Sequence, residues 1–86
     1  MLFDLDEIKT DADANECAEQ LIVEAIKASE ASRRKMAKIR SCSAKIKMLV
    51  KLCTTRGWAD PIKKVKKSFD MLEEARAEMD VNLFGI

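Results

Sequence analysis

Apolar and small side chains recur at alternating spacings of three and four residues along most of the chain. This heptad spacing is typical of helices that pack against one another at a shallow angle, as in a coiled coil. Between residues 15 and 53 it forms two rows, which are Asn15, Ile22, Ser29, Met36, Ser43 and Val50, and Ala18, Ala25, Ser32, Ile39, Ile46 and Cys53. It continues later through Ile62, Val65, Phe69, Leu72, Arg76, Met79 and Leu83. The pattern predicts an all-α fold.

The first helix is predicted to be long. Residues 11–56 contain neither glycine nor proline, and residues with high helix propensity dominate this stretch. Asp13 is the expected N-cap residue, in a capping box with Glu16 three residues later. Gly57 is expected just after the last turn, where helices commonly end in a left-handed residue. A single helix is therefore predicted over residues 13–56.

A second helix is predicted to begin shortly after Gly57. Asp60 can act as its N-cap residue, and Pro61 suits its first helical position. The favoured fold is thus a helical hairpin in one domain. Its parts are an N-terminal segment (1–12), a long helix (13–56), a turn (57–60), a second helix (61–80) and an apolar tail (81–86).

The middle of the long helix offers an alternative. Ser29 and Ser32 make the heptad rows small and polar there, so this is the most favourable place for the helix to break. A break near residues 29–32 would give a three-helix bundle in place of the hairpin.

The predicted long helix also carries a second apolar stripe on a different side. A surface helix usually has one such stripe, so a helix with two is expected to lie between neighbours. The second helix covers only one of them, and the other needs either the N-terminal segment or another subunit. The second possibility is favoured, which predicts self-association, as a homodimer. We expect its interface to contain Ala37, Ala44, Met48, Leu52 and Ile22.

Charge is divided into blocks along the chain. Residues 1–32 have a net charge of −7, residues 33–67 of +12 and residues 68–86 of −4, which sum to +1. In a hairpin, the acidic start of the long helix would extend away from the second helix. It is then expected to meet a basic stretch of a second chain.

The basic block is most concentrated around the predicted turn. Lysines in the first turns of a helix oppose the helix dipole, so their presence there favours a binding function over a purely structural one. A basic tip with an indole suits the acidic surface of a protein, and it also suits phosphates and stacked bases of DNA or RNA. The candidate contact residues are Arg56, Trp58, Lys63, Lys64, Lys66 and Lys67.

Catalysis and cofactor binding are not expected. The chain has no histidine, no tyrosine and no glycine-rich phosphate loop, so common acid–base and nucleotide-binding chemistry lacks its residues. Cys17, Cys42 and Cys53 form no CxxC pair, which predicts neither a metal site nor a disulfide but three reduced thiols in a cytoplasmic protein. No apolar run approaches the roughly 20 residues of a membrane span.

The sequence thus predicts a non-catalytic interaction module, a small regulator or inhibitor that binds a macromolecule through the basic tip. An acidic protein partner is favoured because the net charge of +1 gives little long-range attraction to a polyanion. DNA or RNA binding through the same tip is the alternative. No cofactor, membrane or small-molecule substrate is expected.

Overall fold

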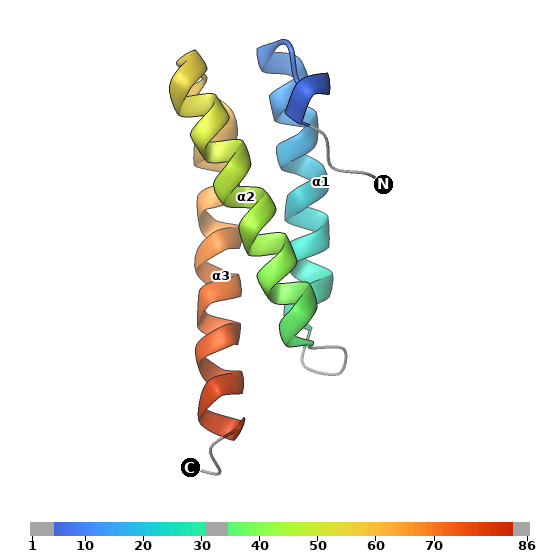
Figure 1. Ribbon diagram of the computed structural model, residues 1–86, viewed down its shortest axis with the longest axis vertical. Helices are drawn as coiled ribbons and strands as arrows, with labels where there is room; N and C mark the ends of the chain where they lie inside the picture. Colours follow the sequence, from blue (N-terminus) through green and yellow to red (C-terminus); the bar gives the residue numbers. More distant parts are fainter. Residues whose placement is uncertain (1–4, 31–34, 84–86) are drawn as a thin grey trace.

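A computed structural model describes residues 5–30 and 35–83, with the backbone alone for residues 79–83. A single 3₁₀ turn, η1 (Leu5–Glu7), precedes the helices α1 (Asp11–Ser29), α2 (Met36–Arg56) and α3 (Ala59–Leu83). Each helix packs against the other two, and neighbours in sequence run antiparallel (Figure 1). The molecule measures 45 × 22 × 15 Å. The all-α prediction is confirmed.

The single helix predicted over residues 13–56 is instead two helices. The chain leaves the helical conformation at Glu30 (φ −61°, ψ 127°), and Lys35, just before α2, is also extended (φ −131°, ψ 128°). Residues 31–34, which include Ser32 of the predicted break, lie outside the described residues. Packing explains the interruption, because folding back buries a stripe of α1 that a straight helix would leave in water. That stripe is Ala14, Cys17, Ala18, Leu21, Ala25 and Ala28.

The start of α1 also differs from the prediction. Thr10, and not Asp13, is the N-cap residue, so the helix starts at Asp11 and the N-terminal segment is shorter than predicted. The Thr10 hydroxyl accepts a hydrogen bond from the Asp13 N–H, and the Asp13 carboxylate accepts from the N–H groups of Lys9 (3.1 Å) and Thr10 (3.2 Å). These bonds, first of all that from Lys9, hold the pKa of Asp13 below its ordinary value. The capping box therefore exists three residues before its predicted place.

The end of α2 confirms the role predicted for Gly57. This glycine has φ 77° and ψ 23°, the left-handed conformation that a side chain disfavours. Its N–H donates to the Thr54 carbonyl and the Trp58 N–H donates to the Cys53 carbonyl (2.9 Å), which is the Schellman arrangement. Two of the last carbonyl groups of α2 are thereby satisfied, and the chain reverses direction.

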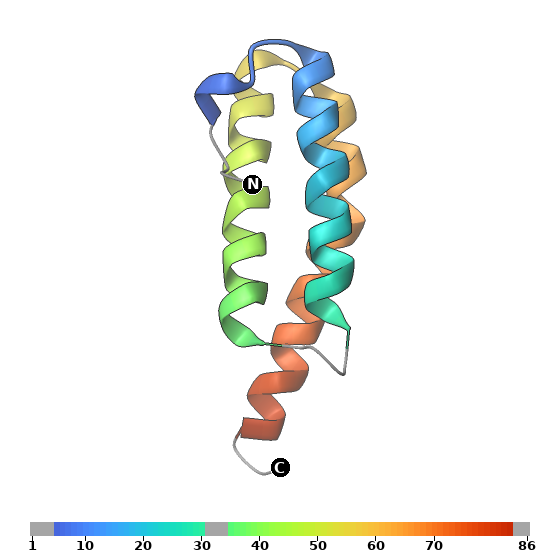
Figure 2. The same ribbon diagram turned by 90° about the vertical axis from the view of Figure 1, so that its right-hand side faces the viewer.

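Helix α3 is longer than predicted at both ends. It starts at Ala59, so Asp60 lies inside the first turn, where its charge suits the helix dipole. Pro61 is the third helical residue, still within the turn whose N–H groups have no helical acceptor. At the other end, Val81–Leu83 belong to α3 and not to a separate tail, and residues 84–86 lie outside the described residues. Figure 2 shows this end of α3 projecting past α1 and α2.

The core lies along the axis shared by the three helices. Alanines dominate the α1 contribution, while α2 and α3 supply larger side chains, so α1 approaches its neighbours closely. The largest fully buried side chains are Ile39, Ile46, Leu49, Leu72, Val65, Pro61, Cys42 and Cys53.

Candidate functional site

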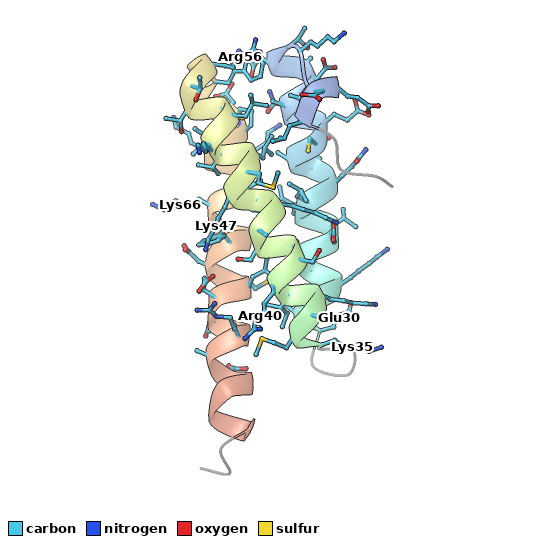
Figure 3. All side chains as sticks on the ribbon, in the orientation of Figure 1. Glu30, Lys35, Arg40, Lys47, Arg56 and Lys66 are labelled. Carbon is cyan, nitrogen blue, oxygen red and sulfur yellow. The ribbon has the colours of Figure 1, made fainter. Side chains whose placement is uncertain are left out.

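The turn between α2 and α3 places Arg56 beside Trp58. The Arg56 guanidinium carbon lies 5.8 Å from the centre of the Trp58 ring, which is cation–π distance. Trp58 is half-buried and packs against the core, while Arg56 is exposed at the end of α2 (Figure 3). The Trp58 ring thus packs onto the end of the helical bundle, and Arg56 covers part of the ring surface that stays exposed.

The four lysines predicted to form one tip separate onto different sides of α3. All four are exposed. Lys64 turns to α1, where its Nζ lies 3.6 Å from Glu19 Oε1. Lys66 turns to α2. Lys63 and Lys67, one helical turn apart, have no ion-pair partner among the described residues. The predicted cluster is therefore a basic surface that surrounds the start of α3, and not a compact tip.

An open groove lies between α2 and α3. Its floor is apolar and is formed by Ile46, Val50, Ile62, Val65 and Phe69, and its volume is about 350 Å³. Three lysines border it: Lys47 and Lys51 on α2, and Lys66 on α3. Lys47 Nζ lies 5.7 Å from the centre of the Phe69 ring, and Figure 3 shows Lys47 and Lys66 on the same side of the molecule. The groove joins apolar surface to positive charge.

Sequence reasoning did not identify this groove. Lys47 and Lys51 are spaced i, i+4 on α2, and Ile62 and Phe69 are spaced i, i+7 on α3, so each helix shows its half of the groove. The hairpin prediction placed the basic start of the second helix beside Lys51, but it considered only charge and not the apolar surface between the two helices.

Acidic residues of α1 meet basic residues of the same chain. Glu24 Oε1 lies 3.0 Å from Lys45 Nζ of α2, and Glu19 contacts Lys64 of α3. The prediction that this acidic stretch extends away from the rest of the chain is therefore wrong, while its contact with a second chain stays a prediction. The predicted long helix is interrupted after Ser29, and this interruption allows α1 to fold back onto α2 and α3.

The residues predicted for a dimer interface do not form one surface. Ala37 and Ala44 of α2 are exposed, and Met48 keeps 47% of its surface exposed. Leu52 is half-buried and shares a surface hollow with Leu5. Ile22 lies on α1, where it is half-buried and packs against the core. The exposed residues of the predicted interface are thus Ala37, Ala44 and Met48, which lie along one stripe of α2.

The three cysteines are buried, reduced thiols. Burial, followed by the nearby Glu24 carboxylate, raises the pKa of Cys42 to about 11. Burial also raises the pKa of Cys17 and Cys53. A raised pKa disfavours the thiolate, which is the reactive form. Within the part of the chain that the structure describes, no cluster of three or more potential ligands could hold a metal ion.

The raised pKa of Cys42 predicts a loss of stability at alkaline pH. Below pH 9 the thiol is neutral in both folded and unfolded chains, whereas above pH 9 the unfolded chain loses its proton first. Urea unfolding at pH 8 and pH 10.5 measures how far the free energy of unfolding of the wild type exceeds that of Cys42→Ala. This advantage should be smaller at pH 10.5 than at pH 8 by at least about 1 kcal/mol. An advantage that stays constant between the two pH values would contradict this.

Among the described residues, no helix has the length and hydropathy needed to cross a membrane. No protein-family model, curated protein or solved structure matched the chain, and its function is therefore inferred from its own residues.

Proposed function

We propose that this protein is a non-catalytic interaction module, a small regulator or inhibitor that binds a partner protein with an acidic surface. The contact surface consists of the exposed cations of α2 and of the first half of α3. It includes the predicted residues Arg56, Lys63, Lys66 and Lys67. Of the other two predicted residues, Lys64 pairs with Glu19 of α1, and Trp58 packs on the core beside Arg56.

The separation of charge in the folded chain carries this proposal. Helix α2 contains six basic and no acidic residues, and five of the six are exposed. The acidic helix α1 neutralises only Lys45 of α2 through an ion pair in the described structure. A surface with so many uncompensated cations attracts acidic partners and repels basic ones.

An acidic protein is favoured over DNA or RNA by the surroundings of the cations. Arg56 covers part of the Trp58 ring, which reduces the indole surface available to stack on a base. Apolar side chains lie between Lys47, Lys51 and Lys66. A protein surface can contact both kinds of group, whereas a phosphate backbone can contact only the lysines.

A charge-matched pair of variants tests this proposal. The triple variant Lys63→Gln, Lys66→Gln, Lys67→Gln removes three cations from the proposed surface, and Lys9→Gln, Lys27→Gln, Lys35→Gln removes three exposed cations elsewhere. Fluorescence anisotropy with labelled poly-glutamate should show roughly tenfold weaker binding for the first variant in 50 mM salt, and less than about twofold for the second.

Three results would overturn this proposal. The first is equal weakening by both variants, and the second is no binding of poly-glutamate by the wild type. The third is tight binding of random duplex or single-stranded DNA with a log–log salt slope of about −3 to −5, which is the signature of several phosphate contacts. That slope would support the nucleic-acid alternative.

We also propose that the protein self-associates through the exposed α2 stripe of Ala37, Ala44, Met48 and Leu52. Because α2 has no acidic residue, two copies of this stripe would bring like charges together. Salt screens such repulsion, so dimer formation should increase between 50 and 500 mM salt, opposite to the binding of an acidic partner.

Met48→Glu should weaken this dimer, because the dimer would lose the apolar contact of the methionine and remove the new carboxylate from water. The control is Ala77→Glu, which makes the same change of charge at an exposed position of α3. Sedimentation equilibrium measures both. A 9.7 kDa species at every concentration and salt level would show that the stripe does not mediate dimerisation.

A further inference from the structure

We infer that the groove between α2 and α3 binds one amphipathic, acidic α-helix of the partner protein. This inference rests on the proposed function and specifies it, since it names the form of the ligand and the place where it binds. The groove is defined by its floor (Ile46, Val50, Ile62, Val65 and Phe69) and by its border (Lys47, Lys51 and Lys66).

The chain itself contains an example of such binding. Helix α1 is an acidic helix that packs its apolar stripe against α2 and α3. Its Glu24 pairs with Lys45 of α2, and its Glu19 pairs with Lys64 of α3. One ion pair therefore joins α1 to each of the two helices that it packs on. The groove offers a similar combination of an apolar seam with lysines on both supporting helices. A partner helix seated there would be a fourth helix.

The size of the groove fits about two turns of a helix. Its floor on α3 extends from Ile62 to Phe69, and seven residues at 1.5 Å each span about 10 Å. Side chains at positions i, i+3 or i+4, and i+7 of a ligand helix cover the same length on one face. The lysines on both borders then select acidic residues on both flanks of that face. Lys47, which already contacts Phe69, marks one border.

Glu73, one helical turn after Phe69 at the end of the groove, is satisfied within the protein. Among the described residues, Glu73 accepts a hydrogen bond from Ser43 (3.3 Å) and forms an ion pair with Arg76 (3.4 Å). It therefore adds little repulsion toward an acidic ligand. Asp70, one turn after Lys66, is exposed outside the lining, and the charged residues of the lining itself are three lysines.

The probe for this inference is a designed 14-residue peptide with blocked ends. It has leucine at positions 4, 8 and 11, glutamate on both flanks and alanine elsewhere. A second peptide has the same composition in an order that breaks the apolar face. In isothermal titration calorimetry at 100 mM salt, the amphipathic peptide should bind the full chain at least tenfold tighter than the second peptide.

The position of binding is tested with two charge-matched double variants. Lys51→Gln, Lys66→Gln changes the groove border, while Lys9→Gln, Lys27→Gln removes two exposed lysines that lie outside both the groove and the proposed contact surface. The first should weaken binding of the amphipathic peptide at least fivefold and the second less than twofold. Glutamine preserves helix propensity, and circular dichroism checks that both variants fold.

The outcomes separate this inference from the proposed function. Equal binding of the two peptides, or equal weakening by the two variants, would overturn the groove as a helix site. The proposed acidic-partner surface is then decided by the poly-glutamate variants alone. Failure of the wild type to bind both peptides and poly-glutamate would overturn the groove and the proposed function together.

Discussion

Replacing Ala25 with glutamate is expected to lower the free energy of unfolding by about 3–5 kcal/mol, the cost of a buried charge without a partner. Ala25 is 0% exposed because α1 packs against α2 and α3. For a domain of this size, the loss corresponds to a fall in melting temperature of roughly 15–30 °C. Thermal unfolding followed by circular dichroism measures it.

The control for this substitution is Val23→Glu on the same helix. Val23 keeps 52% of its surface exposed, so the new carboxylate stays in water and the melting temperature should change by only a few degrees. If α1 and α2 instead formed one straight helix, Ala25 would also face water. Equal melting temperatures for the two variants would therefore contradict the folded-back position of α1.

Leu72→Ala is expected to cost about 2–5 kcal/mol, because it leaves a cavity in the centre of the core. Leu72 is 0% exposed and belongs to the α3 face that the other two helices cover. Urea unfolding of the purified variant gives the change in free energy directly.

Met48→Ala removes a side chain of similar size from the surface. Met48 is 47% exposed, so this variant should lose less than about 1 kcal/mol at a protein concentration where the chain is monomeric. A loss as large as that of Leu72→Ala would show that Met48 is buried in the folded protein, against the structure.

Local signals in the sequence were sufficient for some features of the fold. The heptad spacing gave the helical class, and Gly57 marked the end of α2 because it adopts the positive φ of a helix C-terminus. The N-terminal cap was ambiguous, since Thr10 and Asp13 are both followed three residues later by an acid. Ile8, which is 7% exposed, joins the core just before the cap and favours the earlier start.

Tertiary packing decided what the sequence pattern left open. No glycine or proline marks the interruption after Ser29, and burial of small residues such as Ala18 and Ala25 favours it. The candidate site depends on the same packing. Lys64 and Lys66 are two positions apart, and only the positions of α1 and α2 around α3 direct one to Glu19 and the other to the groove.

The most direct test of the binding surface is amide chemical-shift mapping of the ¹⁵N-labelled protein during titration with the amphipathic acidic peptide. We expect the shift changes to concentrate in residues 46–51 and 62–69, which contain the floor and border of the groove. Residues 11–29 of α1 should change little. Changes confined to α1, or no changes at saturating peptide, would contradict the assignment of the α2–α3 groove as the binding site.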